Sequence, residues 1–381
     1  TQQDIQRMIG SFDASWRPFT WMHNTGTVGI DLSNRMDLTL CHYGECPVQG
    51  TQRQGRSIVA HTNDRNVSAK LMSILAWRPR PWADLKSTIG ADYINIEADA
   101  SAATGNILPP GASRPQDGAI PSVSGTLATA TKTLGMYVQE QLGVNDRLFL
   151  TAAVRSDQNS AFGTNFQSVL YPKLSASYVI SDEPFFPKWP LVNQIRLRGA
   201  YGQSGVQPGP TASLVTFAAT NLNVPSSLGA ASGTDTPGLR SSDLGNPNLK
   251  PETSAEFEGG VDARVLDSRV SVELTYFRKQ TKDALIQQPI APSAAPSQVN
   301  VLRNLGAIRN SGFEAVLQMA LMDRSKFGWD MTISASHVSN VVVSLGFDAA
   351  GLPNRTVGTG NNRDSVGTSV RGWHYRQYTY A

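Results

Sequence analysis

The side chains that could act as a pair of acids or bases lie close together in the chain. Glu256 and Glu258 are two residues apart, so on a β-strand they would share one face, about 7 Å from each other. A glycosidase usually carries its two carboxylates on opposed strands across a cleft. We therefore interpret this pair as solvated carboxylates and not as an acid/base pair.

Other residue types that do chemistry are scattered. The five histidines form no HExxH pair, and Ser204 in GQSG lacks the glycine spacing of a nucleophile elbow. Asp157, Asn159 and Ser160 could offer oxygen ligands to calcium, but the EF-hand spacing is missing and a turn explains them more simply. The sequence therefore predicts no enzyme, no cofactor and no metal site.

The only two cysteines, Cys41 and Cys46, are separated by four residues. A turn at Gly44 could bring them together as a disulfide, or they could join His42 and Glu45 around a metal ion. Adjacent residues such as Cys41 and His42 chelate poorly, and no second ligand cluster follows at zinc-finger spacing. The choice between disulfide, metal and free thiols then depends on the compartment.

Composition excludes several classes of protein. Only 17% of the 381 residues are charged, against about 25% in an ordinary soluble domain. The net charge is +3 and no basic stripe interleaves with aromatic residues, so nucleic acid is not expected as a partner. The longest apolar runs, such as residues 74–77, are far shorter than the roughly 18 residues of a membrane-spanning helix.

The elements that position these residues are predicted to be strands, because apolar residues recur with a period of two along the chain. In residues 134–144 the even positions are apolar except for Glu140, and the odd positions are polar or glycine. Segments of this kind predict about a dozen long antiparallel strands. The residues predicted to face lipid share one phase: Leu134, Met136, Val138, Leu148, Leu150, Leu174, Ile195, Leu197, Val270, Val272 and Leu274.

Connection lengths favour a membrane barrel over a soluble sandwich, which also alternates. Short and long connections alternate strictly, as in outer-membrane barrels with periplasmic turns and extracellular loops. The short ones are residues 17–19, 78–82, 143–146, 182–192, 266–268 and 322–326. The long ones are residues 36–56, 101–124, 158–167, 204–250, 287–303 and everything after 346.

Six of the seven tryptophans adjoin short connections, and only Trp373 falls in the long set. The six are Trp16, Trp21, Trp77, Trp82, Trp189 and Trp329. An amphipathic ring is stable at the level of the lipid headgroups, so this placement predicts an aromatic girdle on the periplasmic side. The alternative is that the rings plug the bottom of a soluble barrel.

Four segments resemble the TonB-dependent outer-membrane transporters, all but NPNLKPETS the SusC/RagA branch in particular, and they occur in that family's order. They are residues 134–163, residues 171–186, NPNLKPETS at 246–254 and NLGAIRNSGFE at 304–314. The resemblance covers essentially the whole chain. It implies that residues 1–381 form about 12–13 strands of a barrel of about 22 strands, with the plug and the N-terminal periplasmic domain outside this chain.

The resemblance also implies a function and partners. A SusC-like barrel in the outer membrane of a Gram-negative type of cell takes up a bulky nutrient, an oligosaccharide or a peptide. It is surrounded by outer-membrane lipid, uses energy delivered through TonB and carries a SusD-like lipoprotein on its extracellular loops. The row expected to face the lumen is a mixed-charge wall that binds a polar solute or the plug: Arg196, Arg198, Glu256, Glu258, Asp262 and Arg264.

Two other functions remain open at this point. A secreted β-propeller or sandwich could bind glycans, although a propeller should repeat every 40 to 50 residues or so, and no repeat is visible. An outer-membrane hydrolase would need a nucleophile or an acid/base pair, and none stands out. In the transporter interpretation Cys41 and Cys46 lie in an extracellular loop, where oxidising conditions favour a disulfide.

Overall fold

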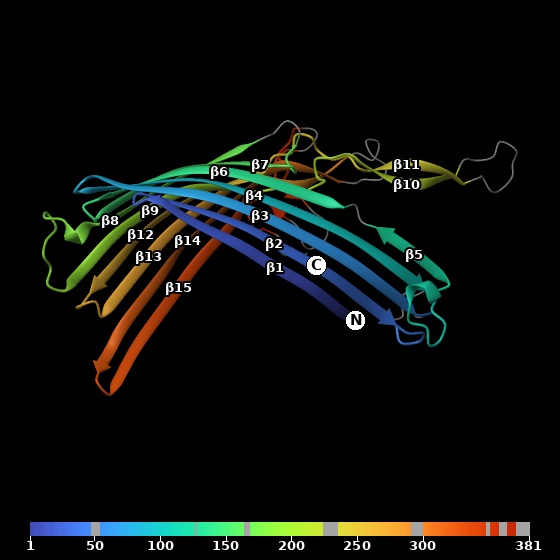
Figure 1. Ribbon diagram of the computed structural model, residues 1–381, viewed down its shortest axis with the longest axis horizontal. Helices are drawn as coiled ribbons and strands as arrows, with labels where there is room; N and C mark the ends of the chain where they lie inside the picture. Colours follow the sequence, from blue (N-terminus) through green and yellow to red (C-terminus); the bar gives the residue numbers. More distant parts are fainter. Residues whose placement is uncertain are drawn as a thin grey trace, which may run out of the picture. The chain divides into compact units, whose positions relative to one another are not determined.

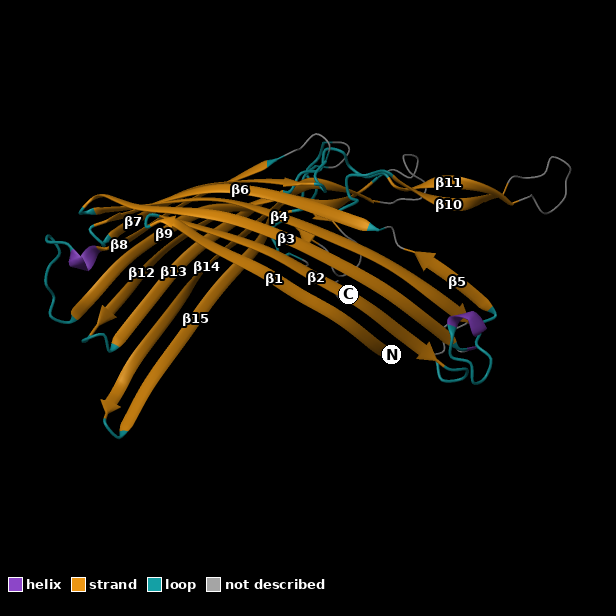
Figure 2. Cartoon of the chain, in the orientation of Figure 1, coloured by secondary structure: helices purple, strands orange, loops and turns teal. Residues whose placement is uncertain are grey.

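The computed structural model describes residues 1–46, 54–125, 128–163, 168–223, 235–290, 300–347, 351–357 and 364–370. Strands make up nearly all of this part of the chain, as Figures 1 and 2 show. Its two helical elements are 3-10 turns of three residues, η2 (Pro115–Asp117) and η3 (Ile180–Asp182). None of the helices described is long and apolar enough to cross a membrane.

The strands form one sheet of 13 members and two small two-stranded sheets. The large sheet contains β1 (Gln2–Phe19), β2 (Met22–Cys41), β3 (Arg56–Arg80), β4 (Ala83–Asn106), β5 (Ile120–Gly125), β6 (Thr129–Val144), β7 (Leu148–Asn159), β8 (Val169–Val179), β9 (Val192–Val206), β12 (Glu252–Val265), β13 (Val270–Pro289), β14 (Asn300–Arg324) and β15 (Phe327–Ser344). The small sheets pair β10 (Thr216–Asn223) with β11 (Asp235–Asp243), and β16 (Thr356–Val357) with β17 (Asp364–Ser365).

Strand order in the large sheet follows chain order from β1 to β15, with β5 paired to β4 and the β10–β11 hairpin outside the sheet. The predicted all-β antiparallel fold is therefore confirmed. The propeller and sandwich alternatives are wrong, because the strands build neither separate blades nor two stacked sheets. Among the described residues, β1 is paired only with β2 and β15 only with β14, so this chain holds an incomplete barrel.

The chain divides into two compact units. Unit 1 comprises Thr1–Ile74 and Ile89–Met136, and unit 2 comprises Leu75–Thr88 and Tyr137–Ala381. In unit 1, the hairpin β1–β2 places apolar residues opposite one another, as in the pairs Met8–Leu32 and Phe12–Val28. The alternate positions are mostly polar, with Ile5 and Ile9 as exceptions, and include the ion pair between Arg7 and Asp31, whose N–O distance is 2.6 Å.

In unit 2, the registers of six ladders set seven strands in the same phase: β7, β8, β9, β12, β13, β14 and β15. One continuous row runs Tyr178–Leu197–Val261–Leu274–Ala315–Ala335 from β8 to β15. We call the face that carries this row the apolar face and the opposite one the polar face. The residues predicted to face lipid from β7 to β13 all lie on the apolar face: Leu148, Leu150, Leu174, Ile195, Leu197, Val270, Val272 and Leu274.

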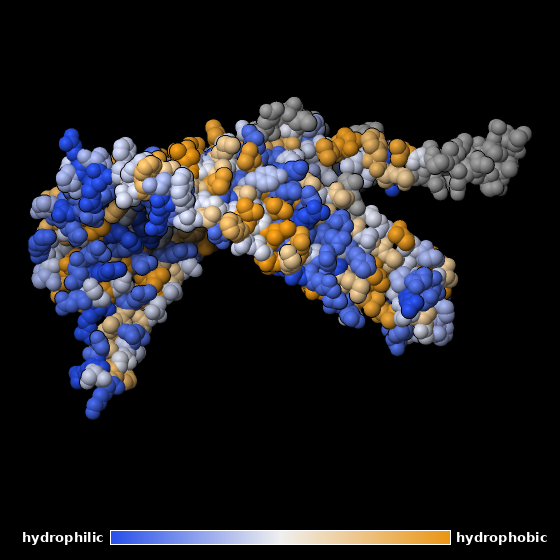
Figure 3. All heavy atoms as spheres, in the orientation of Figure 1, coloured by the Kyte–Doolittle hydropathy of each residue, from blue (hydrophilic) through white to orange (hydrophobic). Residues whose placement is uncertain are grey.

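The apolar face is not covered by any other part of the described chain. Leu174 is 56% exposed and Phe313 is 54% exposed, whereas Leu249, near the long connections, is fully buried. Hydrophobic side chains accordingly lie at the visible surface of the molecule in Figure 3. An apolar area of this extent is not stable in water and requires an apolar medium, which is the condition of a barrel's outer wall in a membrane.

Aromatic rings gather at two levels along the strands. The six tryptophans beside short connections are all exposed, as the predicted girdle requires. Trp373 lies outside the described residues. A second group of aromatic rings, farther from the short connections, was not found from the sequence. It consists of the cross-strand pair Tyr201–Phe257 and the row Tyr276–Phe313–His337.

Several predicted loop boundaries are wrong, because strands continue into segments that were assigned to long loops. β2 runs on to Cys41, β4 to Asn106 and β13 to Pro289, and a hairpin, β10–β11, forms inside residues 204–250. The extensions of β4 and β13, SAATGN and QQP, lack apolar alternation and therefore looked like loops, whereas the extension of β2, MDLTLC, does alternate and was overlooked. Each still has a neighbouring strand that supplies backbone hydrogen bonds, as Gln2 is paired with Leu38 across β1 and β2.

Candidate functional site

The six residues of the predicted mixed-charge wall all lie on the polar face of unit 2. Arg196 and Arg198 come from β9, and Glu256, Glu258, Asp262 and Arg264 come from β12. The two strands are neighbours, and their register sets Arg196 directly opposite Asp262 and Glu258 opposite Ala200. The strand period of two therefore brings all six to one surface. That this surface lines the lumen of a complete barrel remains a prediction.

Asp262 is the centre of this surface. Arg196 Nε donates to Asp262 Oδ2 at 2.8 Å, and Arg198 Nε donates to Asp262 Oδ1 at 3.1 Å. Arg198 also donates from its terminal nitrogen to Thr275 Oγ1 at 2.5 Å. A Cβ atom at Gly260 would lie 2.8 Å from the Arg198 guanidinium carbon, so glycine leaves the room that this guanidinium occupies. The cluster thus holds two cations in fixed positions with one carboxylate.

The other wall residues are less constrained. Lys279 Nζ lies 3.8 Å from Glu256 Oε2. Within the described chain, neither Glu258 nor Arg264 has a side-chain hydrogen bond or ion pair. Two further carboxylates were missed in the sequence, Glu273 opposite Asp262 and Glu314 opposite Thr275. Glu273 adjoins Leu274 and Glu314 adjoins Phe313, so the alternation of faces along each strand could have placed both carboxylates on the polar face.

A hollow of about 230 Å³ lies on the polar face beside these charges. Its lining includes Ser175, Ser177, Arg196, Arg198 and Glu258. Small side chains on β8 leave this space, and donors and acceptors of both charges surround it. Such a surface can hydrogen-bond sugar hydroxyls, peptide amides or a polar protein segment.

No group of three or more His, Cys, Asp and Glu residues able to hold a metal ion occurs in the described ranges. The contacts of Asp157 and Asn159 are those of a turn region and not of a calcium site. Asp157 Oδ1 accepts from Arg155 at 2.7 Å, and Asn159 Oδ1 accepts from the backbone N–H of Ala161 at 2.7 Å. The second contact is an Asx turn, which is what the sequence favours there.

The NPNLKPE segment forms a latch against the loop-side ends of β13 and β14. Asn304 accepts a hydrogen bond from the Lys250 N–H at 3.0 Å and donates to the carbonyl oxygens of Lys250, at 2.7 Å, and Asp283, at 2.9 Å. Glu252 Oε1 accepts from the Leu285 N–H at 2.7 Å. Asp283 is a bulge residue with φ of 57°, outside the regular ladder. The motif therefore secures the ends of these strands.

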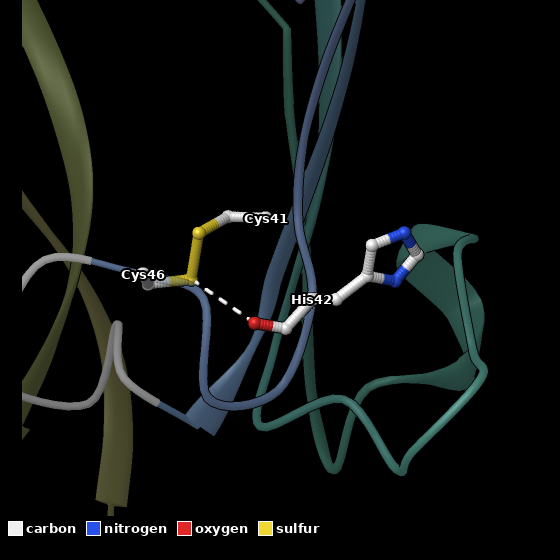
Figure 4. Close-up of a disulfide and its surroundings, with 3 residues drawn as sticks. All are labelled: Cys41, His42 and Cys46. Carbon is white, nitrogen blue, oxygen red and sulfur yellow. Dashed lines mark hydrogen bonds between the residues drawn. A yellow bond between two sulfur atoms is a disulfide. The ribbon is translucent and has the colours of Figure 1, made fainter.

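Cys41 and Cys46 are joined by a disulfide at the loop-side end of β2 in unit 1 (Figure 4). Their Cα atoms are 5.5 Å apart, and the Cys46 sulfur lies 3.5 Å from the His42 carbonyl oxygen. Nearby, the N–H groups of Ile107 and Leu108 donate to the carbonyl oxygens of Gly55 and Gln54. The connections after β2 and β4 are thereby packed together.

We expect Cys41 and Cys46 to be oxidised in the full-length protein in its membrane. The ring closed by five residues of separation should stabilise the protein by about 2 kcal/mol at most, so Cys46→Ser should leave the barrel folded and loosen only the loop tip. Mass spectrometry after alkylation checks the oxidation state. Two thiols that can be alkylated without prior reduction would exclude the disulfide, and stoichiometric zinc would support the metal alternative.

Removal of the central carboxylate is expected to weaken the polar face. Asp262 is only 14% exposed and accepts from two arginines, so Asp262→Asn should destabilise the barrel by about 1–3 kcal/mol. Chemical denaturation of the refolded full-length protein measures the change. Glu258→Gln is the matched control, because the Glu258 side chain makes no hydrogen bond or ion pair with the residues the structure describes. Equal losses for both variants would contradict this account.

The fold can be compared with known proteins. Residues 9–378 match the family model described as TonB dependent receptor-like, beta-barrel. The chain belongs to this family. Among curated relatives, TonB-dependent receptor P26 of Formosa agariphila is 31% identical over 233 residues, which is 59% of this chain and 22% of the relative. TonB-dependent receptor SusC of Bacteroides thetaiotaomicron is 23% identical over 222 residues, 57% of this chain and 21% of SusC.

A solved structure of the RagAB peptide transporter superposes with a TM-score of 0.79 at 18% identity, over 96% of this chain and 39% of that one. The family, the all-β barrel fold and the likeness to SusC expected from the four sequence segments are thus confirmed. This TonB-dependent receptor barrel domain spans about a fifth of the length of its curated relatives. The family match and the relatives named here are TonB-dependent receptors, and none of them is described as a hydrolase.

Proposed function

We propose that the full-length protein takes up a bulky polar nutrient, an oligosaccharide or a peptide, across the outer membrane with energy delivered through TonB. The observation that carries this proposal is the sidedness of a single sheet. Its apolar face needs lipid, and its polar face holds the Arg196–Asp262–Arg198 cluster beside a hollow. A polar face of this kind keeps the lumen of a barrel hydrated and offers hydrogen bonds to a hydrophilic solute.

The proposal includes parts that lie outside this chain. Further strands would pair with the free edges of β1 and β15, and a plug and an N-terminal periplasmic domain would complete the protein. The polar face would then contact the plug or the passing solute. A SusD-like lipoprotein would cover the long connections, as the likeness to SusC and to the RagAB transporter suggests.

Uptake by cells tests this function. The strain that carries the full-length gene, its deletion mutant and a TonB-deficient mutant would each receive a fluorescently labelled tryptic peptide mixture or a labelled starch-derived oligosaccharide mixture. We expect one mixture to accumulate in the periplasm only when both the gene and TonB are present. Accumulation that is independent of TonB, or equal in the deletion mutant, would contradict the proposal.

A further inference from the structure

One ionisable side chain interrupts the apolar positions of β6. Glu140 lies between Val138 and Leu142 in the apolar phase of this strand and is exposed. Its Oε2 accepts a hydrogen bond from Ser87 Oγ of β4 at 2.8 Å. No cation is paired with it among the described residues. A carboxylate without a counter-ion on a lipid-exposed surface is costly, so it calls for a positively charged partner.

Beside Glu140, the apolar face of unit 2 has a groove of about 540 Å³. Small residues form a row across three strands, Ala176 opposite Gly199 and Gly199 opposite Gly259. Tyr201, paired to Phe257, bounds the groove on one side. On the other side, the next residues in the apolar phase are Leu197 and Val261, which are also paired. A Cβ atom at Gly199 would meet only one backbone oxygen, at 3.8 Å, so this space is open.

The groove is lined by apolar side chains, among them Leu142, Leu150 and Leu174, and Glu140 lies at its edge. Glu140 is also close to the end of β6 at Val144, where the short connection to β7 begins. Short connections are assigned to the periplasmic side of an outer-membrane barrel, so Glu140 is at the level of the headgroups of that leaflet. An occupant must therefore present an apolar chain to the groove and a cation to the carboxylate.

We infer that this groove is a specific phospholipid site, which takes one acyl chain between the two pairs of large residues and binds the primary ammonium of the headgroup at Glu140. An ammonium–carboxylate hydrogen bond neutralises Glu140, and Ser87 holds the carboxylate in position. A lipid with an anionic, ammonium-free headgroup fills the groove equally well but is repelled by Glu140. The site therefore selects phosphatidylethanolamine over phosphatidylglycerol.

Native mass spectrometry of the full-length protein, reconstituted in nanodiscs that contain both phospholipids and then released, counts the lipids retained. We expect one retained phosphatidylethanolamine per barrel, at about tenfold preference, which is what a charge-assisted hydrogen bond supplies. Glu140→Gln should abolish the preference and Gly199→Leu should reduce retention of both lipids. Asp146→Asn, which removes a nearby charge in the β6–β7 connection, should change neither.

Equal retention of the two lipids by the unmodified protein, or an unchanged preference in Glu140→Gln, would overturn the inference. A change of oligomeric state in Gly199→Leu with lipid retention unaltered would also overturn it, because the groove would then seat a protein surface. Glutamine at position 140 and leucine at position 199 are both compatible with a β-strand. Heat-modifiable migration on gels confirms that each variant is folded. The readout does not depend on transport, so it is independent of the proposed function.

Discussion

Arginine in place of Leu174 is expected to destabilise the folded barrel by about 2–4 kcal/mol, whereas arginine in place of its neighbour Ser175 should cost little. Leu174 lies on the apolar face, opposite Tyr201, and is exposed to whatever surrounds the barrel. Ser175 lies on the polar face, opposite Ala200, and adjoins the hollow beside Arg198. The two positions are one residue apart and differ in which side of the sheet they occupy.

The measurement is the free energy of unfolding of the full-length protein refolded in lipid vesicles, with heat-modifiable migration on gels as a second readout. Leu174→Ala is a further control, because it removes the same side chain without adding a charge. Equal losses for Leu174→Arg and Ser175→Arg would count against the membrane assignment of the apolar face.

Substitution of Asn304 by alanine is the second change with a large expected effect. It removes the three hydrogen bonds that tie Lys250 and the bulge residue Asp283 to β14. Each part-buried backbone group left without a partner costs about 1–3 kcal/mol, and water can satisfy some of them, so we expect a loss of about 2–4 kcal/mol. The NPNLKPE segment should also become accessible to proteases.

Chemical denaturation and limited proteolysis of the full-length protein measure these two effects. Gln318→Ala is the matched control, because the Gln318 amide makes no side-chain hydrogen bond to the residues the structure describes. Asn304→Ala should be cut near residue 250 faster than both Gln318→Ala and the unmodified protein. An unchanged cleavage rate would mean that the latch does not hold the segment.

The sequence by itself determined the fold class, the phase of β6 to β9, β12 and β13, and the alternation of short and long connections. Because side chains alternate with a period of two along a strand, the apolar residues of each strand, such as Leu197 and Leu274, share one face. A short turn between two strands makes them neighbours in the sheet. The same local rule placed Arg196 and Asp262 on one surface. It also assigned the six exposed tryptophans correctly to the ends of strands.

Only the tertiary structure decided which of these residues meet. The register between β9 and β12 is a property of two strands separated by a long insertion, and it alone sets Arg196 against Asp262 rather than against Glu258. The latch of Asn304 on Lys250 and the groove over Gly199 likewise join residues far apart in the chain. Alternation predicts which face of the sheet a side chain occupies. Which side chains of the neighbouring strand it lies beside depends on the register between the strands, which no local pattern specifies.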